Sequence, residues 1–231
     1  MMFTIGGDGT FLRAVTYIRN LNIPILGINT GRLGFLATVQ KDQIEETVDL
    51  LINKEFTTQD RSLLQITTSP QRKEFAELDF ALNEITIARR NTTSMIGVKT
   101  YLNNEYLTNY WADGLIISTP TGSTGYSLSC NGPVVLPDSK SFIITPIAPH
   151  NLNARPMVIP DEISIQLEVT ASEKDYLISL DSRISTVPLG TKINIKKAPF
   201  SIKSILLKEQ SFLKTLRGKL LWGEDTRNKS L

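Results

Sequence analysis

Hydrophobic residues follow helical spacing near both ends of the chain and strand-like spacing through its long middle part. At the start, an apolar run over Met1–Ile5 indicates a strand, and a second run over Ile23–Ile28 predicts a short buried strand. Between them, apolar residues at helical intervals predict a helix over Thr10–Asn20. The residues on its apolar face are Phe11, Leu12, Val15 and Ile18.

Two further helices are predicted, one on each side of the middle part. The first begins near Asp42, which forms an analogue of a capping box with Glu45, and continues to about Asn53. Its apolar face contains Ile44, Val48 and Leu51. The second covers Ser211–Trp222 and is amphipathic, so we expect it to pack back on the first domain. We interpret its basic residues as a solvated face, with an anion site as the alternative. They are Lys214, Arg217 and Lys219.

The middle part consists of short alternating or apolar runs that predict strands. These runs are Leu63–Thr67, Phe80–Ala88, Val98–Leu102, Glu105–Thr108, Gly114–Thr119, Phe142–Ile147, Ser164–Thr170, Tyr176–Leu180, Thr191–Lys196 and Ser201–Leu207. Turns are predicted at Asn103-Asn104, because asparagine tolerates positive φ, and at Asp181-Ser182. We therefore expect an α/β plus all-β fold. A truncated α/β domain would cover residues 1–60, a larger β-rich domain residues 61–208, and the helix of residues 209–231 would pack on the first domain.

The composition excludes several classes of protein. The chain has 231 residues, of which 41% are hydrophobic and 21% charged, as in ordinary globular proteins. A net charge of +2 is too small to indicate binding to nucleic acid or to an anionic membrane, and no apolar run reaches the roughly 18 residues of a membrane helix. Cys130 is the only cysteine, which fits a reducing, cytoplasmic compartment. Because at most one strand precedes the first glycine loop, we expect an N-terminal truncation or an internal start codon.

Three glycines and one carboxylate form the segment Ile5-Gly6-Gly7-Asp8-Gly9-Thr10, between the first strand and the first helix. Glycine lets backbone N–H groups approach a bound group closely, and N–H groups at the start of a helix favour anions such as phosphate. Because a bare carboxylate repels phosphate, Asp8 would hold a divalent metal or accept a proton from an attacking hydroxyl. The alternative is a tight turn with a solvated aspartate. A second glycine loop, Asn29–Leu36, follows the next strand, where ligands bind in open α/β sheets.

Asn83 and Glu84 lie inside an otherwise apolar strand. In a half-buried strand one of the two must point inward, and burying an unpaired carboxylate or amide is costly. Ribose hydroxyls or an adenine edge would satisfy both side chains. The alternative is a pair at a strand edge that bonds to nearby backbone.

The segment Trp111–Ser129 combines a buried strand with a turn that is rich in glycine and hydroxyl groups. Its hydroxyl side chains after the strand are Thr119, Thr121, Ser123, Thr124, Ser127 and Ser129. Gly122 and Gly125 permit close approach of the backbone to a ligand. Tyr126 can present a flat face to a heterocyclic ring, and Asp113 can bond a sugar or an amide. The combination favours a nucleotide cradle over an ordinary capped turn.

Taken in this order, these segments resemble the NAD kinase family, and the resemblance covers most of the chain, to about Pro160. The segments that carry it are Gly6–Thr10, Asn29–Phe35, Asn83-Glu84, Asp113-Gly114, Ser118–Ser129 and Pro149–Pro156. The Gly-Gly-Asp-Gly-Thr element alone is shared with diacylglycerol kinases, sphingosine kinases and phosphofructokinases. The Asn-Glu pair and the long hydroxyl loop are much more specific to NAD kinases.

The resemblance implies transfer of the γ-phosphoryl group of ATP to the 2′-hydroxyl of the adenosine ribose of NAD, which gives NADP. It implies that Asp8 is the catalytic acceptor and that Asp8 and Gly9 contact the dinucleotide. Further implied contacts are Arg13, Phe35, Asn83, Glu84, Asp113, Thr124, Gly125, Tyr126, Ser127, Leu128 and Ser129. Many family members have alanine in place of Gly125, a small change that should not close the pocket. Members of the family also form homodimers or tetramers, so a homo-oligomer is expected.

Other roles and functions stay open on the sequence alone. A divalent metal, expected to be Mg²⁺, would arrive with ATP, because the sequence shows no separate cluster of metal ligands. A lipid kinase of the same superfamily is an alternative, although no basic amphipathic segment for membrane docking is visible. A non-catalytic NAD(P)-binding fragment is another.

The roles of three single residues also stay open. Arg13 would bind the ligand or lie on an exposed face. His150 would bond loop backbone or lie near the ligand, and Arg155 would reach a phosphate or tie two loops together.

Overall fold

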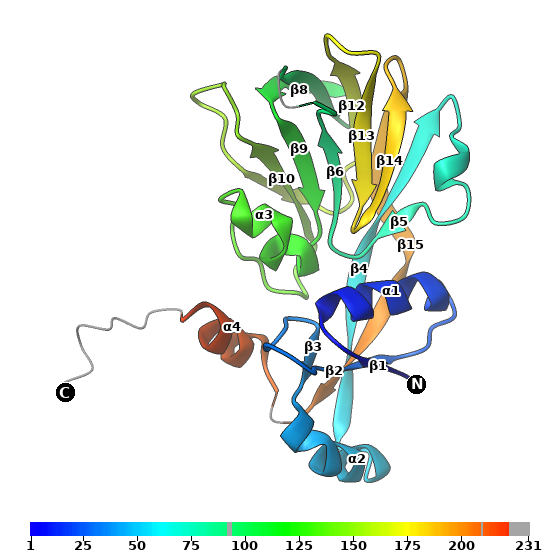
Figure 1. The fold of residues 1–231 in the computed structure, drawn as a ribbon, viewed down its shortest axis with the longest axis vertical. Helices are drawn as coiled ribbons and strands as arrows, with labels where there is room; N and C mark the ends of the chain where they lie inside the picture. The colour runs from blue at the N-terminus through cyan, green and yellow to red at the C-terminus, as the bar shows by residue number, and fades with distance from the viewer. Residues whose placement is uncertain (92–93, 209, 222–231) are drawn as a thin grey trace, which may run out of the picture. The chain divides into compact units, whose positions relative to one another are not determined.

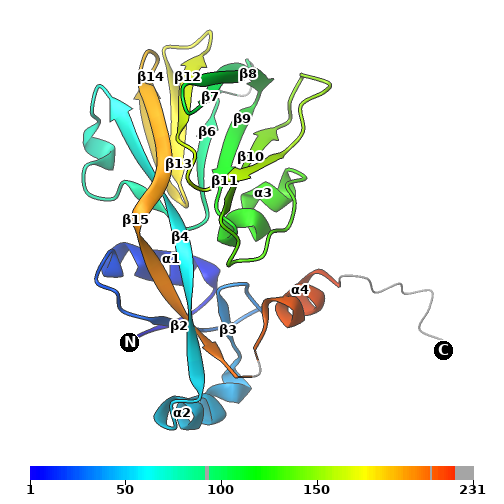
Figure 2. The same cartoon turned by 180° about the vertical axis from the view of Figure 1, so that it is seen from behind.

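The computed structural model describes residues 1–91, 94–208 and 210–221 and divides the chain into two compact units. Unit 1 consists of Met1–Asp60 and Ile202–Leu231, and unit 2 consists of Arg61–Ser201. Residues 202–208 thus group with unit 1, whereas the sequence places them in the β-rich domain. The chain passes from one unit to the other inside two long strands, β4 (Phe56–Ser69) and β15 (Lys192–Leu207), which pair with each other (Figure 2).

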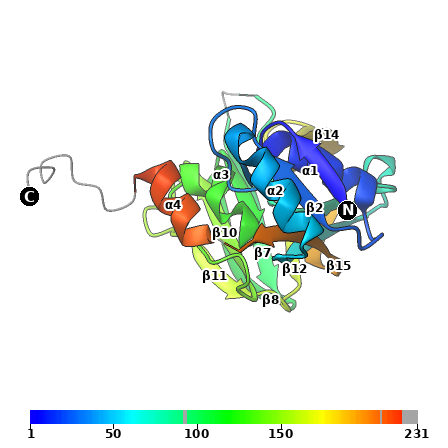
Figure 3. The ribbon, with the colours of Figure 1, turned by 90° about the horizontal axis from the view of Figure 1, so that it is seen from below.

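Unit 1 contains a small sheet of parallel strands with helices packed on it (Figures 1 and 3). Its strands are β1 (Met2–Ile5), β2 (Ile25–Ile28) and β3 (Ala37–Val39), with the ends of β4 and β15. Its helices are α1 (Asp8–Ile18), the 3-10 helix η1 (Lys41–Gln43), α2 (Ile44–Ile52) and α4 (Phe212–Leu220). Strands β1, β3 and β15 run parallel to β2. In such a sheet the loops that follow neighbouring strands lie at one end, so the loops after β1 and β2 come together.

Helix α1 buries the face that the sequence predicts, except that Ala14 rather than Leu12 completes it. It begins at Asp8, two residues before the predicted start, because Gly7 adopts extended backbone and accepts the first helical hydrogen bonds. Asp8 is therefore part of the helix rather than of the turn before it.

The helical segment begins near Asp42 as predicted, but the predicted capping box is wrong. Gln40 and Gln43, rather than Asp42 and Glu45, form a capping box, and they enclose η1. Helix α2 follows at Ile44 without a side-chain cap.

The predicted buried face of α2 is also wrong in part. Ile44 and Val48 are exposed, whereas Thr47 is buried. Leu50 and Leu51 pack on a core formed by β2, β3 and β15. The apolar residues of α2 lie on two sides of the helix, so spacing alone did not decide which side faces the sheet.

Helix α4 corresponds to the helix predicted over Ser211–Trp222; Trp222 and the rest of the predicted C-terminal segment, like residue 209, lie outside the described residues. Ser211 Oγ caps it by accepting a hydrogen bond from the Lys214 N–H at 3.1 Å. Leu216 is its buried residue. In the part of the chain that the structure describes, no helix is long and apolar enough to cross a membrane.

Unit 2 consists of two β-sheets that enclose one hydrophobic core (Figures 1 and 2). Its further strands are β5 (Phe80–Ala81), β6 (Glu84–Ala88), β7 (Ile96–Leu102), β8 (Glu105–Ala112), β9 (Gly114–Ser118), β10 (Ser141–Ile147), β11 (Met157–Pro160), β12 (Ile165–Thr170), β13 (Asp175–Leu180) and β14 (Arg183–Pro188). Its short helices are η2 (Lys73–Phe75), η3 (Thr121–Thr124) and α3 (Tyr126–Ser129). One sheet has the antiparallel order β11-β10-β9-β6-β13-β14. In the other, β15, β12, β7 and β8 follow one another, and β4 carries β5.

The strand prediction misses three strands and differs in two others. Strands β3, β11 and β14 had not been predicted, and the two predicted runs near the end form the single strand β15. The run Phe80–Ala88 is broken into β5 and β6 at Leu82 and Asn83. Both predicted turns are confirmed: Asn103 and Asn104 have φ of 49° and 69° in the β7–β8 hairpin, and Asp181 has φ of 52° between β13 and β14.

Candidate active site

The carboxylate of Asp8 is held by backbone N–H groups of the loop that follows β2. Asp8 Oδ2 accepts a hydrogen bond from the Phe35 N–H at 2.8 Å, and Oδ1 accepts from Leu36 at 3.0 Å and Ala37 at 2.9 Å. Asp8 is also the first residue of α1, where the helix dipole favours negative charge. Since a carboxylate oxygen can accept two hydrogen bonds, Oδ2 retains capacity for one further donor. Asp8 is thus fixed in orientation and not simply solvated.

At one position in the glycine loop before α1, the backbone conformation is one that only glycine adopts without strain. Gly6 has φ of 152°, a region that L side chains rarely enter. A Cβ at Gly6 would lie 2.3 Å from Thr10 Oγ1. The Gly6 N–H donates to Ile28 O at 2.9 Å, which ties the loop to the end of β2.

The buried side chain of Asn29 organises the loop that holds Asp8. Asn29 Nδ2 donates to Arg32 O at 2.7 Å and to Ala37 O at 3.2 Å, and Asn29 Oδ1 accepts from the Gly31 N–H at 2.7 Å. These three bonds fix both ends of the loop. The loop therefore presents its N–H groups to Asp8 as a preformed set.

We predict that Gly34→Ala will lower kcat by about 10²-fold, because small displacements of a catalytic group can have effects of this size. A Cβ at Gly34 would lie 2.0 Å from Asp8 Oδ1, so either the carboxylate or the loop must move. Gly31→Ala is the matched control, since its nearest neighbour would be Asn29 Oδ1 at 3.9 Å. Steady-state kinetics and thermal unfolding of both variants check this. Equal kcat values for the two variants would show that the close fit at Gly34 is irrelevant to turnover.

Phe35 and the last turn of α4 lie beside Asp8. The ring centroids of Phe35 and Phe212 are 6.1 Å apart. Lys219 Nζ lies 5.0 Å from the Phe35 centroid and 3.9 Å from Asp8 Oδ2. Lys219 is therefore not merely part of a solvated face. No pattern in the sequence predicted these contacts, because packing on the first domain does not specify the glycine loop as the neighbour of α4.

Gly9 and Arg13 lie on the exposed part of α1. A Cβ on Gly9 would meet nothing within 4 Å. Among the described residues, the hydrogen bonds to the Asp8 side chain come from the loop after β2 and not from Arg13. Contacts of Gly9 and Arg13 with a dinucleotide stay predictions.

In unit 2, the carboxylate of Asp181 holds the backbone around Asn83. Asp181 Oδ2 accepts from the Leu82 N–H at 3.0 Å, and Oδ1 accepts from Asn83 at 2.8 Å and Glu84 at 3.2 Å. The Asp181 N–H donates in return to Glu84 O at 2.9 Å. These bonds take the place of strand pairing and explain the break between β5 and β6. The sequence marked Asp181 only as a turn residue, so its role in orienting Asn83 and Glu84 was missed.

Three buried polar atoms near this break have no hydrogen-bond partner among the described residues: Asn83 Oδ1, Glu84 Oε2 and Ser118 Oγ. Glu84 and Ser118 are directly paired residues of β6 and β9. Buried polar atoms are normally satisfied, so such a group points to a missing partner such as a ligand. The ligand interpretation of the Asn-Glu pair stays a prediction, because the Tyr126 backbone N–H also interacts with the Glu84 carboxyl group.

Burial gives Glu84 an unusual protonation behaviour. Glu84 as a whole residue is only 9% exposed. This burial, with a smaller contribution from the nearby charge of Asp181, raises the pKa of Glu84 to about 8, although the Tyr126 backbone N–H acts to lower it. Glu84 is therefore largely protonated at neutral pH and can donate as well as accept a hydrogen bond.

Several hydroxyl groups after β9 bond within the protein. Thr119 Oγ1 donates to Leu82 O at 2.6 Å, and Ser127 Oγ shares a hydrogen bond with Thr145 Oγ1 at 2.8 Å. In this arrangement the two hydroxyls shape the loop. Their abundance in the sequence is explained at least in part by folding.

The remaining predicted residues of this loop differ in exposure. Thr124 Oγ1 donates to the backbone of Thr121 at 3.2 Å. Tyr126 is 45% exposed, so its ring is open to a ligand. Leu128 is half-buried and Ser129 is exposed. Dinucleotide contacts from these residues stay predictions.

The carboxylate of Asp113 is not isolated but forms an ion pair with Arg89. Its Oδ2 lies 2.9 Å from Arg89 Nη2, and its backbone O accepts from the Arg89 N–H at 3.0 Å. Both side chains are partly exposed. Asp113 is thus held in a fixed position, and a contact with a sugar or an amide stays a prediction.

We predict that Gly122→Ala will destabilise the protein far more than Gly125→Ala. A Cβ at Gly122 would lie 2.1 Å from Asn83 O, which is backbone and cannot move freely. A Cβ at Gly125 would lie 2.9 Å from Glu84 Oε2, the end of a flexible side chain. We expect Gly122→Ala to cost about 1–3 kcal/mol or more of unfolding free energy, and Gly125→Ala under about 1 kcal/mol. Thermal unfolding measures both, and a larger loss for Gly125→Ala would contradict this packing argument.

His150 and Arg155 serve the loop in which they lie. The His150 N–H donates to Trp111 O at 2.8 Å, and the residue is exposed. Arg155 Nη1 donates to the backbone oxygens of Leu152 and Ala154 at 2.9 and 2.8 Å. The Arg155 bonds stay within its own loop and do not tie two loops together. The His150 bond is made by its backbone, so a ligand contact of either side chain stays a prediction.

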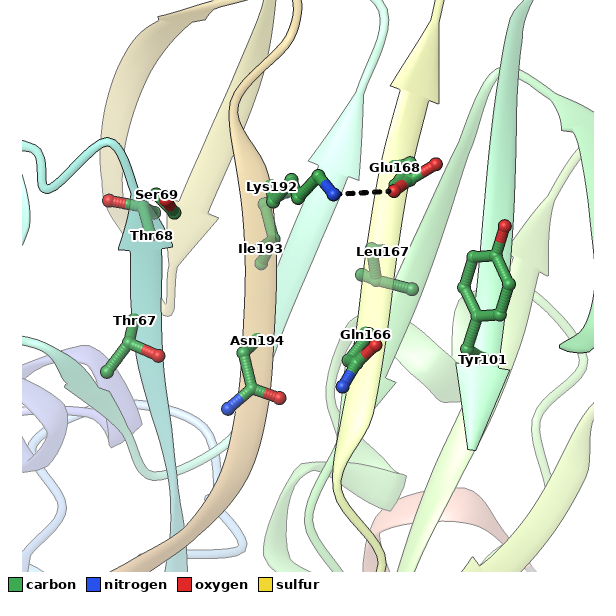
Figure 4. A pocket seen from close by; sticks show the side chains of 10 residues that line it. All are labelled: Thr67, Thr68, Ser69, Tyr101, Gln166, Leu167, Glu168, Lys192, Ile193 and Asn194. Atoms are coloured by element: carbon green, nitrogen blue, oxygen red, sulfur yellow. Dashed lines mark ion pairs between the residues drawn. The ribbon is translucent and has the colours of Figure 1, made fainter. Parts of the chain in front are cut away.

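One pocket of about 290 Å³ lies on unit 2 over β4, β15, β12 and β7 (Figure 4). Its charged residues, Lys192 and Glu168, are 3.6 Å apart and well exposed. Figure 4 shows polar side chains from separate strands around it, and none of the predicted site residues lines it. We assign it no function.

The described residues do not form a metal site made by protein side chains alone, because they contain no group of three or more His, Cys, Asp or Glu residues that could hold an ion. Both oxygens of Asp8 already accept N–H donors.

Family models match both parts of the chain. Residues 1–56 match the model of the ATP-NAD kinase N-terminal domain. Residues 82–207 match the model of the ATP-NAD kinase C-terminal domain.

Curated proteins named NAD kinase align with nearly the whole chain. A curated NAD kinase of Flavobacterium johnsoniae is 60% identical over 228 residues, which are 99% of this chain and 78% of that protein. The NAD kinase of Bacteroides fragilis is 47% identical over 98% of this chain and 78% of its own length. Among solved structures, yeast NADH kinase complexed with NADH has a TM-score of 0.88 and 26% identity, covering 98% of this chain and 67% of that one. An NAD kinase from Archaeoglobus fulgidus in complex with ATP has a TM-score of 0.78 and 30% identity, covering 95% and 82%. The chain belongs to the NAD kinase family.

Proposed function

We propose that this chain transfers the γ-phosphoryl group of ATP to the 2′-hydroxyl of the adenosine ribose of NAD, giving NADP. The observation that carries the proposal is the group of unsatisfied buried atoms on Asn83, Glu84 and Ser118. Hydroxyl and ring-nitrogen groups of an adenosine can satisfy such atoms, and the exposed ring of Tyr126 can stack on its base. The names of the relatives support the same substrates.

We infer that Asp8 accepts the proton of the attacking hydroxyl. The 2′-oxygen forms a bond to the γ-phosphorus while the bond from that phosphorus to the β–γ bridging oxygen breaks, and ADP leaves with the bonding electrons. The hydroxyl proton passes to Asp8 Oδ2, the oxygen with the free acceptor position. Since phosphoryl transfer depends mainly on positioning and charge stabilisation, the fixed orientation of Asp8 is its main contribution.

We infer that the charge of the triphosphate is neutralised by Mg²⁺ that enters with ATP. The described residues offer no side-chain cluster to hold the ion on their own. No step of the proposed proton transfer passes through it.

The predicted dinucleotide contacts are part of the proposal. In unit 1 they are Asp8, Gly9, Arg13 and Phe35. In unit 2 they are Asn83, Glu84, Asp113, Thr124, Gly125, Tyr126, Ser127, Leu128 and Ser129. The expected domain limits of 1–60, 61–208 and 209–231 likewise stay a proposal, as does a cytoplasmic location, which rests on the single cysteine.

An assay that follows NADP formation tests the function. The purified chain is incubated with Mg-ATP and NAD, and the NADP formed is measured with an NADP-specific dehydrogenase. A parallel reaction with radiolabelled ATP and diacylglycerol tests the lipid kinase alternative. We expect NADP and no labelled lipid. Binding of NAD without turnover would favour the non-catalytic alternative, and labelled lipid without NADP would overturn the proposal.

We also propose that the chain forms a homo-oligomer through unit 2. Trp111, Leu152, Met157 and Val158 expose large apolar side chains. The loop that contains Leu152 bonds to β8 through Asn151 Oδ1, which accepts from the Trp111 N–H at 2.7 Å. Exposed apolar surface of this kind is typical of protein interfaces. Size-exclusion chromatography with light scattering should give at least twice the mass of the chain, and a monomer at micromolar concentration would contradict this.

A further inference from the structure

Lys219 is placed by the packing of α4 on the loop that holds Asp8. It lies in the last turn of α4, one residue after Gly218. A Cβ at Gly218 would be 3.7 Å from Leu33 Cδ2, so the helix runs close to the loop at this point. At the other end of the helix, its first residue Phe212 packs near Phe35. The loop and α4 thus share two contact points, and Lys219 lies next to one of them.

The ammonium group of Lys219 lies near Asp8 without bonding to it. Lys219 Nζ is 3.9 Å from Asp8 Oδ2, beyond the 2.7–3.2 Å of an N–H···O hydrogen bond. The ammonium group therefore keeps its N–H donors for an acceptor other than Asp8 Oδ2. The centroid of the Phe35 ring lies 5.0 Å from Lys219 Nζ and attracts the cation. This attraction does not replace a hydrogen bond to an oxygen acceptor.

The position of Lys219 relative to Asp8 suits a phosphoryl group more than a structural ion pair. Its side chain is 35% exposed, so the ammonium is accessible to a ligand. Asp8 Oδ2 is the atom proposed to take the hydroxyl proton, and the phosphoryl oxygens must come close to that hydroxyl. A cation at this place stabilises the charge of the transferred group.

We propose that Lys219 is a further catalytic residue, whose ammonium group binds an oxygen of the phosphoryl group transferred next to Asp8. This inference rests on the proposed function. According to this inference, the last turn of α4 contributes a side chain that contacts the transferred phosphoryl group. A purely structural alternative is that Lys219 only stabilises the C-terminal end of the helix, as any basic residue there does.

Arg217 provides a matched control for that alternative. It lies in the same last turn and carries the same charge, whereas the contacts with Asp8 and Phe35 are made by Lys219. If the helix terminus alone matters, Lys219→Gln and Arg217→Gln should have similar effects. If Lys219 binds the phosphoryl group, only Lys219→Gln should affect the reaction.

The experiment measures NADP formation and the binding of inorganic triphosphate by the full chain. We expect Lys219→Gln to lower kcat by about 10²–10³-fold, with the KM for NAD unchanged, and Lys219→Arg to recover part of the rate. Arg217→Gln should stay within about twofold of the parent, because surface substitutions are usually small in effect. Calorimetric titration with triphosphate should show weaker binding for Lys219→Gln only. Circular dichroism and thermal unfolding confirm that each variant is folded.

The outcomes separate this inference from the function on which it rests. Equal kcat and triphosphate affinity for Lys219→Gln and Arg217→Gln, with NADP still formed, would overturn the role of Lys219 alone. No NADP from the parent chain would contradict the proposed function. In that case, a loss of triphosphate binding specific to Lys219→Gln would still support an anion site at Lys219, and no such loss would overturn it.

Discussion

Replacing Asp8 by asparagine is expected to lower kcat for NAD phosphorylation by about 10²–10⁴-fold and to leave the affinity for NAD nearly unchanged. An amide cannot take the proton of the attacking hydroxyl. The best placement of the amide oxygen is at the Oδ1 position, where it keeps the bonds from Leu36 and Ala37. The amide nitrogen then faces the Phe35 N–H, which loses its acceptor. We therefore also expect a loss of about 1–3 kcal/mol in unfolding free energy.

The control for Asp8→Asn is Asp42→Asn, which changes an exposed aspartate of η1 in the same unit. Steady-state kinetics gives kcat, and fluorescence titration gives the affinity for NAD. Thermal unfolding, at about 2–4 °C per kcal/mol for a protein of this size, separates lost stability from lost chemistry. An Asp8→Asn variant with the kcat of Asp42→Asn would remove Asp8 from the proton transfer.

Replacing Glu84 by glutamine is expected to stabilise the protein increasingly as the pH rises from about 5 to 8. Burial raises the pKa of Glu84 in the folded protein to about 8, from an ordinary value of 4.5. Between these values the folded state keeps a proton that the unfolded state has lost, so the free energy of unfolding falls as the pH rises. At 1.36 kcal/mol per pKa unit, the total effect of this group is on the order of a few kcal/mol. Glutamine has the same shape and does not ionise.

The measurement for Glu84→Gln is the denaturant midpoint of the parent and the variant at pH 5, 6, 7 and 8. The difference between them should grow with pH, and its growth should be absent in Glu162→Gln, a change of an exposed residue in the same unit. A constant difference across this range would show that Glu84 is ionised in the folded protein throughout. Weaker NAD binding by Glu84→Gln than by Glu162→Gln would support its proposed ligand contact.

Local signals in the sequence predicted the elements whose structure depends on their own residues. The helix after the glycine loop, the Asn103-Asn104 hairpin and helix α4 are of this kind. The buried face of α2 was not, since Thr47 rather than Val48 faces the sheet. That choice depends on which strands the helix meets, and these come from other parts of the chain.

The candidate site was predicted in its residues but not in its arrangement. Asp8 and the Asn83-Glu84 pair stand out because a charged or amide group there interrupts a glycine-rich or apolar segment. The groups that orient them are distant in sequence: the N–H groups of Phe35 to Ala37 hold Asp8, and Asp181 holds Asn83 and Glu84. No local pattern reports such pairings. For the same reason, the approach of Lys219 to Asp8 had no signal in the sequence.

A crystal structure of the chain with NAD bound is the most direct test of the proposed chemistry. The account predicts that the 2′-oxygen of the adenosine ribose lies within hydrogen-bond distance, about 2.6–3.2 Å, of Asp8 Oδ2. A structure in which the adenosine binds away from Asp8, with no ribose oxygen near that carboxylate, would contradict it.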